Sequence, residues 1–236
     1  MVIDSRLSRL YWRLTVDHTQ DRTIVRFLRG AGATATWNIL DVGCGYGRNL
    51  TALRAAGLQP TGVEVNPEIA AAVRKAGFVC HAPDDAVLND VRWDAVLMSH
   101  IIEHFDYRSL FAMMNRYLAV LKPGGLLLIA TPLLGDRFYD NFDHVKPYTP
   151  IAIEEVFGRR GLQVQFQATS ELELVDLWIR RRPYCLRLFR SLLRRKTSPA
   201  KLALYSVNVA LALAHRLSFR MIGVADGWVG LYRKLH

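Results

Sequence analysis

Acidic side chains are missing from one long stretch of this 236-residue chain. From Leu177 to Ala225 there is no Asp or Glu, although the same stretch holds eleven Lys and Arg residues. The chain has 31 basic and 21 acidic residues, so subtraction leaves 20 basic against 21 acidic residues elsewhere. The sequence therefore describes a near-neutral body with one strongly cationic segment, which needs its own explanation.

Cysteine is also scarce, with three widely separated residues at Cys44, Cys80 and Cys185. No CxxC pair or Cys/His spacing indicates a zinc site, and three scattered cysteines do not predict a disulfide framework. This pattern favours a reduced, cytoplasmic setting. The N-terminal residues "MVIDSRLSRLYWRL" have no apolar core, so we expect no signal peptide.

Long apolar runs are absent as well. The run "LALYSVNVALALA", residues 202–214, has thirteen residues and includes Ser206 and Asn208. A membrane-spanning helix needs about 20 residues, so we expect none here. With 51% hydrophobic and 22% charged residues, the sequence is that of a folded globular protein, and its length suits one domain.

Short apolar runs alternate with helical patterns of ten to twenty residues along most of the chain. This alternation predicts an α/β fold with a parallel sheet that helices cover on both faces. Residues 1–37 precede the first run and have the spacing of two helices. The expected strands are residues 37–43, 61–66, 78–82, 93–99, 126–132, 162–170 and 227–234.

The stretch "ILDVGCGYGRNL", residues 39–50, places three glycines directly after an apolar strand. A glycine-rich turn lets backbone approach a ligand closely, and the helix behind it presents free N–H groups. The spacing GxGxG differs from the GxGxxG of dinucleotide-binding proteins, and the GK[ST] of a phosphate-binding loop is missing. Glu64 follows at the end of the next strand, where a carboxylate can accept hydrogen bonds from both hydroxyls of a ribose.

Four segments together resemble the class I S-adenosylmethionine-dependent methyltransferases. They are "ILDVGCGYGRNL", "GVEVNP", "WDAVLMSHIIEH" and "LKPGGLLLIATP", and they occur in the family's order. The resemblance implies a Rossmann-like sheet of seven strands with an antiparallel last strand. It also implies S-adenosylmethionine as cofactor and S-adenosylhomocysteine as product.

The resemblance assigns cofactor contacts to particular residues. Asp41, Gly43, Cys44, Gly45 and Gly47 would surround the methionine part. Glu64 would hold the ribose, Asn66 would line the adenine edge, and Ser99 would border the cofactor. The family often has an acid after the third strand, where this chain has Ala82. Asp84 or Asp85, in a shifted position, would then contact the adenine.

Two histidines are candidates for a general base, which an oxygen or nitrogen acceptor can require. His100 follows the fourth strand in "SHIIEHF", and helical spacing would place His104 on the same face. Glu103 and His104 are expected to support the loop. His144 lies in the polar and aromatic loop "GDRFYDNFDHVKPYTP", beside Asp143 and Tyr148. Asp140, Asp143 and His144 offer metal-ligand chemistry, but their spacing is not distinctive, and we expect no metal.

The cationic segment has three interpretations: a structural helical cap, a nucleic-acid-binding surface, or a contact with an anionic membrane or lipid-linked acceptor. Leu and Phe alternate with Arg at helical spacing, which favours peripheral membrane contact through residues 177–225, on the inner face of the membrane. No [DN]PP[YF] motif follows the fourth strand, so a nucleic-acid substrate is less favoured. We therefore expect a small-molecule, saccharide or lipid-linked acceptor, or else a non-catalytic module that binds the cofactor and docks on a partner.

These observations predict one domain over residues 1–236. Its expected parts are N-terminal helices in 1–36, a cofactor-binding core in 37–171, a basic helical insertion in 172–222 and the last strand in 223–236.

Overall fold

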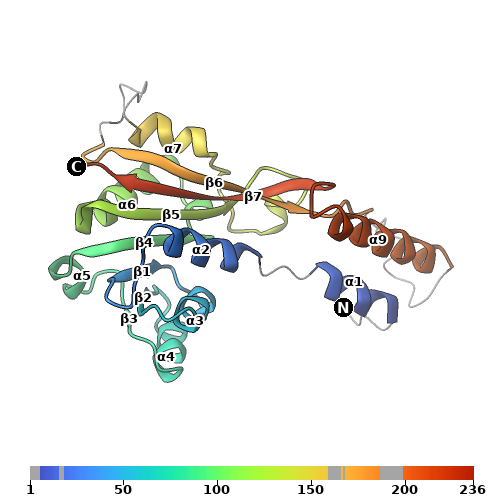
Figure 1. Cartoon of the computed structure of the whole chain (residues 1–236), viewed down its shortest axis with the longest axis horizontal. Coiled ribbons are helices and arrows are strands. Elements are labelled where there is room, and N and C mark those ends of the chain that lie inside the picture. Colours follow the sequence, from blue (N-terminus) through green and yellow to red (C-terminus); the bar gives the residue numbers. More distant parts are fainter. Residues whose placement is uncertain (1–5, 16–18, 159–165, 167, 187–198) are drawn as a thin grey trace. The chain divides into compact units, whose positions relative to one another are not determined.

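The computed structural model describes residues 6–15, 19–158, 166, 168–186 and 199–236 (Figure 1). The chain divides into two compact units. The larger unit comprises Thr19–Ile179 and Gly227–His236, and the smaller comprises Met1–His18 and Arg180–Asp226. Every side chain of the candidate site belongs to the larger unit.

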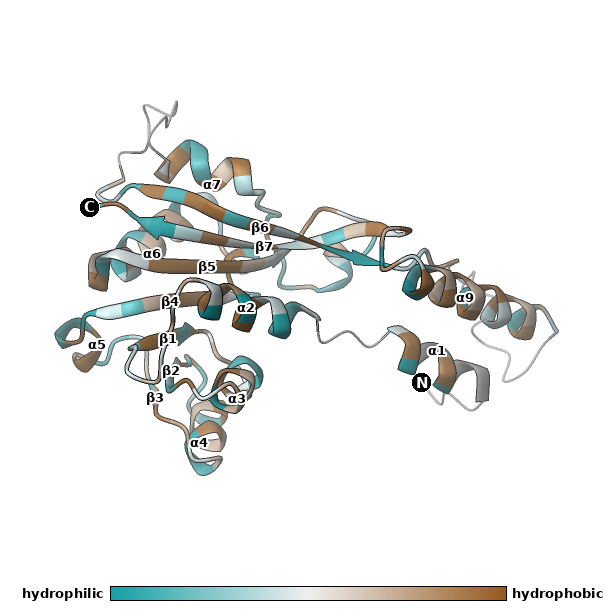
Figure 2. Cartoon of the chain, in the orientation of Figure 1, coloured by the Kyte–Doolittle hydropathy of each residue, from teal (hydrophilic) through white to brown (hydrophobic). Residues whose placement is uncertain are grey.

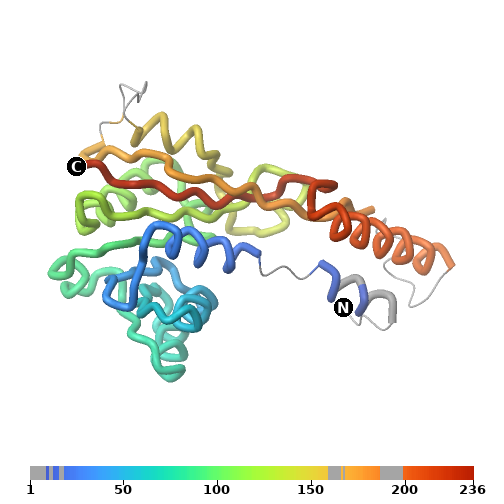
Figure 3. Tube along the Cα trace, viewed as in Figure 1, coloured from blue at the N-terminus to red at the C-terminus, as the bar shows by residue number. Residues whose placement is uncertain are grey.

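A seven-stranded sheet is the framework, with the strand order β3-β2-β1-β4-β5-β7-β6. The pairs β1–β2, β1–β4, β2–β3 and β4–β5 are parallel, whereas β5 and β7 are antiparallel. The tube trace follows β7 between β5 and β6 (Figure 3). The Rossmann-like α/β sheet with an antiparallel last strand is therefore confirmed. The strands are β1 (Ile39–Val42), β2 (Pro60–Val63), β3 (Cys80–His81), β4 (Trp93–Ser99), β5 (Leu121–Pro132), β6 (Leu172–Arg182) and β7 (Val224–Lys234).

Three helices of the larger unit begin at a residue whose side chain caps them. Asn66 accepts hydrogen bonds from the backbone at the start of one helix, Asp106 does so for a second and Thr149 for a third. Prolines occupy the first helical position after Asn66 and after Thr149. The helices of the larger unit are α2 (Thr19–Gly30), α3 (Arg48–Ala55), α4 (Pro67–Lys75), α5 (Val87–Asp90), α6 (Tyr107–Val120) and α7 (Pro150–Phe157), with the 3-10 turns η1 (Ile102–His104) and η2 (Phe138–Asp140).

Alternate residues of the central strands enter two separate cores, as the two-residue period of a strand requires. In β1, Ile39 packs in the core that includes α2, whereas Leu40 packs in the core that includes α6 and α7. β5 divides in the same way, and its nearly continuous apolar colouring reflects burial on both faces (Figure 2). The expected helix layers on both faces are thus confirmed.

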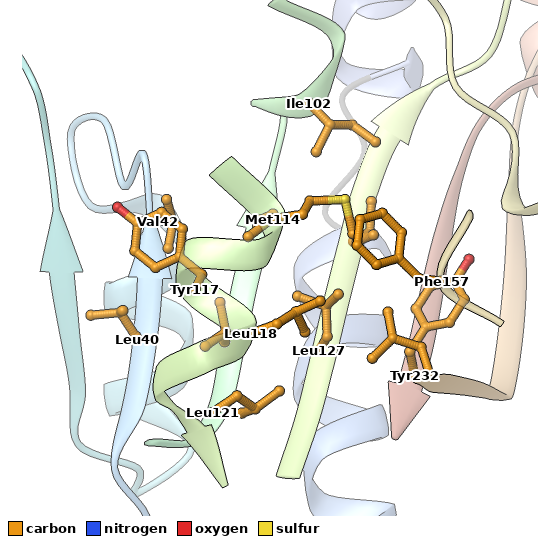
Figure 4. Close-up of a cluster of buried hydrophobic side chains, with 14 of the residues drawn as sticks. Leu40, Val42, Ile102, Met114, Tyr117, Leu118, Leu121, Leu127, Phe157 and Tyr232 are labelled. Carbon is orange, nitrogen blue, oxygen red and sulfur yellow. The ribbon is translucent and has the colours of Figure 1, made fainter. Parts of the chain in front are cut away.

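Figure 4 shows the core on the α6 side. Met114 and Leu118 of α6 lie against the sheet, and Phe157 and Tyr232 close the cluster at the β7 side. Tyr232 is fully buried, and its neighbour Trp228 donates an indole hydrogen bond to the carbonyl of Tyr148 at 2.8 Å. This bond fixes the end of the loop after β5, which carries candidate site residues.

The sixth strand differs from the prediction. β6 runs over Leu172–Arg182, and the described residues of 162–170 form no strand; the others lie outside the described part of the chain. The first eleven residues of the expected helical insertion are therefore strand. Arg180 and Arg182 face Asp226 of β7, with N–O distances of 2.9 and 3.9 Å, so part of the cationic charge is neutralised within the sheet.

The smaller unit contains α1 (Arg6–Thr15) and α9 (Pro199–Leu217), which pack against each other. Arg216 donates hydrogen bonds to the carbonyls of Arg13 and Leu14 at 3.0 and 2.9 Å, where α1 ends. Five of the eleven basic residues, between 187 and 196, lie outside the described residues. Among the helices that the structure describes, none is long and apolar enough to cross a membrane.

Candidate active site

The glycine loop joins β1 to α3 at the carboxyl edge of the sheet. Gly43, Gly45 and Gly47 all have positive φ, at 67°, 51° and 79°. A Cβ atom on Gly43 would collide with Cδ1 of Ile101 and force that side chain to shift, in addition to the backbone strain that the positive φ imposes. The space above Gly45 is open: among the described residues, none apart from its two chain neighbours has an atom within 4 Å of the position a Cβ would take. The loop therefore offers bare backbone to a ligand.

Asp41 lies under this loop and is fully buried. Among the described residues, neither of its carboxylate oxygens has a partner at hydrogen-bonding geometry. Burial raises the pKa of Asp41 to about 7, and the nearby Asn49 amide offsets only part of that effect. A buried carboxyl that is compensated only in part indicates a place where a cationic or hydrogen-donating ligand group binds.

Glu64 is buried just beyond the end of β2 and contacts the glycine loop directly. Its Oε2 accepts a hydrogen bond from the N–H of Gly45 at 2.9 Å, and its Oε1 accepts one from Asn66 at 2.9 Å. The carboxylate is thus held by two backbone groups and retains further lone pairs for a ligand. Because β2 ends at Val63, Val65 is 80% exposed, and the expectation that it lies in a buried strand is wrong.

Cys44 is the buried residue between the first two glycines. Its Sγ lies 3.9 Å from that of Cys80, and both thiols are free. Burial, together with the neighbouring Cys80 and Asp41, raises the pKa of the Cys44 thiol. The thiol is therefore neutral and acts as a small apolar group in the loop rather than as a nucleophile.

The adenine-side candidates fall on the loops after β2 and β3. The Asn66 side chain caps α4 through hydrogen bonds from Glu68 and Ile69. Asp84 is exposed, whereas Asp85 is held by His81 at 2.8 Å and by the backbone of Val87. The hydrogen bond from His81 lowers the pKa of Asp85. Of the two acids, Asp85 has the more defined position.

Ser99 and His100 end β4 beside β5. His100 has φ of 56°, an uncommon conformation for a residue other than glycine, and its N–H donates to Ala130 at 2.7 Å. Its Nδ1 lies 3.1 Å from Glu103 and its Nε2 lies 3.2 Å from the amide oxygen of Gln20. The Gln20 amide also donates to Ser99 Oγ at 3.3 Å.

The expected helix that would place His100 and His104 on one face does not form. Only Ile102–His104 makes a 3-10 turn, and His100 precedes it in the left-handed region. The 3-10 turn instead brings Glu103 back onto His100, while His104 faces Asp143. The two histidines therefore contact different groups: His100 contacts Glu103, and His104 contacts Asp143.

Glu103 contacts His100, directly precedes His104 in the chain, and has no exposed surface. Its Oε1 faces His100, and its Oε2 accepts a hydrogen bond from Thr131 at 2.9 Å. Burial alone would raise the pKa of Glu103, but the contact with His100 and the Thr131 hydrogen bond outweigh it and hold the pKa below its usual value. Sequence reasoning missed Gln20 and Thr131, since no local pattern links them to His100 or Glu103.

The loop after β5 returns to the 3-10 turn η1. The N–H groups of Val145 and Lys146 donate to the carbonyl of Glu103 at 2.8 and 3.2 Å. These bonds hold His144 beside His104, with ring centroids 5.1 Å apart. His144 therefore lies beside His104, whereas His100 contacts Glu103 and Gln20.

An apolar cavity of about 190 Å³ lies along the same loop and the start of α6. Tyr148 closes one side and donates its hydroxyl to the carbonyl of Phe105 at 3.0 Å. Lys146 supplies a cation at the wall. The aromatic side chains that line the cavity are Tyr107, Phe111, Tyr148, Phe157 and Phe166.

Sequence comparison gives a family for the chain. The family described as a methyltransferase domain matches residues 16–167. A curated relative, the ubiquinone biosynthesis O-methyltransferase of Bradyrhizobium sp. (strain ORS 278), is 28% identical over 128 residues. The match covers 50% of each chain, so the chain spans about half the length of this relative in the alignment.

Solved structures show the same fold at low identity. A SAM-dependent methyltransferase from Archaeoglobus fulgidus is 19% identical, with a TM-score of 0.52 over 91% of this chain and 94% of that one. A putative sarcosine dimethylglycine methyltransferase from Galdieria sulphuraria is 14% identical, with a TM-score of 0.56 over 97% and 98% of the two chains. With the matched family and the buried, glycine-lined site, these findings show that the chain belongs to the class I S-adenosylmethionine-dependent methyltransferases, with S-adenosylmethionine as its cofactor.

Proposed function

We propose that the cofactor lies on the glycine loop with its ribose at Glu64 and its methionine part near Asp41. The burial of Asp41, which Asn49 compensates only in part, carries this proposal, because the ammonium of the methionine part would supply the donor that the carboxylate lacks. The open space above Gly45 and the position of Glu64 at the same edge of the sheet support it. The loop surface under the cofactor is formed by Gly43, Cys44 and Gly47. Ser99 lies at its edge.

The adenine end is assigned to the loops that follow β2 and β3. Asn66 lies there as the residue that caps the start of α4. We include Asp84, as the resemblance suggests, and add Asp85, because its contacts with His81 and Val87 give it a fixed orientation. The comparison of the variants Asp84→Ala and Asp85→Ala in cofactor binding separates the two.

The acceptor is proposed to be a small molecule with a large apolar part, including lipid-linked and saccharide-bearing ones. The aromatic cavity beside the loop after β5 supports an apolar part, and the matched O-methyltransferase supports a hydroxyl as the methylated group. S-Adenosylmethionine supplies a methyl group on a sulfonium, so the protein mainly aligns the acceptor and excludes water.

His100 is proposed as the general base for the acceptor hydroxyl. Its Nδ1 is held by Glu103, the orienting partner that a catalytic histidine needs. Its Nε2 lies 3.2 Å from the amide oxygen of Gln20, so an acceptor hydroxyl has to displace that amide and meet the ring with the Nε2 lone pair free. His144 stays the rival. Its Nδ1 is held by the carbonyl of Phe138 at 2.7 Å and its Nε2 lies 3.1 Å from the Asn141 amide nitrogen, whereas His100 is oriented by a buried carboxylate.

The smaller unit is proposed to make peripheral contact with an anionic membrane, in a cytoplasmic protein that acts on lipid-linked molecules. Large apolar side chains of α9 and the turn after it are exposed in a segment without acids. A nucleic-acid substrate has less support, and strong salt-sensitive RNA binding would favour it instead. The exposed residues are Leu202, Val207, Leu213, Leu217, Phe219, Met221 and Ile222.

The activity is tested by incubating the protein and labelled S-adenosylmethionine with separate lipid, aqueous and RNA extracts. Label transfer to a lipid-extract component that is lost in Glu64→Ala is the expected result. Label in RNA alone, or in no fraction despite cofactor binding, would contradict the proposed acceptor class.

A further inference from the structure

Glu103, His104 and His144 form a cluster that the proposed cofactor contacts do not use. One ligand atom from each of the three lies within 4.8 Å of the others. The first two residues come from η1 and the third from the loop after β5, so about forty residues of chain separate them. The backbone bonds from Val145 and Lys146 to Glu103 keep this loop in place.

Both histidines are oriented as metal-binding histidines usually are. His144 Nδ1 lies 2.7 Å from the carbonyl oxygen of Phe138, which only accepts hydrogen bonds, so the proton is on Nδ1. His104 Nδ1 faces the backbone carbonyl of Asp143 at 3.2 Å and its carboxylate at 3.3 Å. In each ring the lone pair is therefore on Nε2. In His144 this nitrogen lies 3.1 Å from Nδ2 of Asn141, whose amide donates to the lone pair and has to turn away when a metal binds. Outer partners of this kind fix the tautomer and direct the other nitrogen to a metal.

Two side-chain contacts hold the third group, Glu103. His100 and Thr131 position one carboxylate oxygen each, which leaves additional lone pairs for a ligand. Glu103 is fully buried, whereas the His104 side chain is 28% exposed. The cluster thus has a fixed inner side and an entry path from solvent.

We propose that Glu103, His104 and His144 bind a divalent cation of the zinc, manganese or iron class. Two imidazoles and one carboxylate suit these borderline ions better than Mg²⁺ or Ca²⁺. Ligand atoms around a tetrahedral zinc lie about 3.3 Å apart, so shifts of about 1 Å close the site. Three protein ligands leave a coordination position open for an acceptor oxygen.

The role of the ion depends on the proposed function, although its binding does not. A divalent cation lowers the pKa of an oxygen ligand, so it would help to deprotonate an acceptor hydroxyl bound in the open position.

The test uses untagged, chelator-treated protein, titrated separately with Zn²⁺, Mn²⁺ and Mg²⁺ in a calorimeter. We expect one equivalent of Zn²⁺ or Mn²⁺ to bind and Mg²⁺ to bind more weakly. His104→Gln and His144→Gln should each weaken binding more than tenfold. His236→Gln, at an exposed histidine outside the cluster, is the matched control and should bind as the unaltered protein does.

Thermal unfolding with S-adenosylhomocysteine, on the same samples, checks folding and cofactor binding independently. Absence of stoichiometric binding of Zn²⁺ and Mn²⁺, or equal binding by both cluster variants and the control, would overturn the metal site. If cofactor stabilisation persists in that case, the proposed methyltransferase function stands without the metal. Glu103→Gln provides a second cluster variant if a histidine variant does not fold.

Discussion

At Asp41, the ionised form that would pair with the cofactor lowers the stability of the ligand-free protein. A carboxyl with a pKa of about 7 is protonated in the folded protein between about pH 4 and pH 7, while the unfolded chain has already released that proton. The folded state binds the extra proton, so the free energy of unfolding falls as the pH rises through this window. The shift corresponds to about 4 kcal/mol at most. The cofactor's ammonium would reverse this loss by pairing with the ionised form.

Asp41→Asn should therefore flatten the dependence of stability on pH. Without ligand, its melting temperature at pH 8 should equal or exceed that of the unaltered protein, because no charge is buried. Its stabilisation by S-adenosylhomocysteine should fall sharply. Thermal unfolding from pH 5 to pH 8 measures both effects, and parallel pH profiles for the two proteins would count against the account of Asp41.

His100→Ala should lower kcat by about 10²–10⁴-fold if the ring is the general base. Cofactor binding should change little, since Glu64 and the glycine loop are intact. Gln20→Ala, which removes only a neighbour of the ring, should have a smaller effect on kcat. Steady-state kinetics on an identified acceptor give the comparison, and unaltered turnover in His100→Ala would exclude the base assignment.

At the scale of an element, the loop between β1 and α3 depends on glycine for two reasons. Gly43 has φ of 67° and lies against Ile101. Gly43→Ala should cost about 1–3 kcal/mol of stability, the range for a residue forced into an unfavourable conformation. Chemical denaturation and calorimetric titration of the cofactor check this prediction.

Gly30→Ala is the matched control for Gly43→Ala. Gly30 ends α2 and has no positive φ, and among the described residues no atom would crowd a Cβ there. Its substitution should leave both stability and cofactor affinity close to those of the unaltered protein. Equal losses in the two variants would mean that the loop needs no special conformation at Gly43.

Elements that are buried on both faces could be predicted closely from the sequence. The run over Trp93–Ser99 coincides with β4, because its residues enter two cores and are almost all apolar. β6 could not be placed in this way. It is the last strand in the sheet order, and Leu172 is its only buried residue, so charged residues such as Asp176 and Arg181 interrupt the apolar pattern.

The candidate site likewise contains residues whose position could be predicted from the sequence and residues whose position could not. Asp41, the glycines and Glu64 follow from one local motif, and the structure brings them to one edge of the sheet. The left-handed conformation of His100 and the approach of His144 to Glu103 depend on backbone hydrogen bonds between distant segments. No local spacing in the sequence encodes these contacts, so a helix was expected where a single 3-10 turn forms.

At the scale of the whole molecule, the two compact units correspond to two proposed tasks. The larger unit holds every candidate residue for methyl transfer, and the smaller unit combines basic residues with exposed apolar ones. Electrostatic attraction to anionic lipid and burial of apolar side chains would act together in membrane contact. Both contributions can be changed without altering the larger unit.

The protein should therefore float with vesicles that contain anionic phospholipid, and binding should weaken as salt is raised. Leu213→Glu combined with Leu217→Glu should reduce flotation, because it places charge on exposed apolar positions of α9. Ile151→Glu, at an exposed apolar position on α7, is the matched control. Equal binding to neutral and anionic vesicles, or none to either, would contradict the proposed contact.

The central claim is that the glycine loop and Glu64 bind S-adenosylmethionine, and thermal unfolding with S-adenosylhomocysteine tests it most directly. At about 100 times its dissociation constant, the ligand should stabilise the unaltered protein by about 2.7 kcal/mol. Glu64→Ala should lose this stabilisation, whereas Glu68→Ala, an exposed carboxylate one turn away on α4, should keep it. Equal stabilisation of all three proteins would place the cofactor elsewhere, and no stabilisation of the unaltered protein at millimolar ligand would contradict the account as a whole.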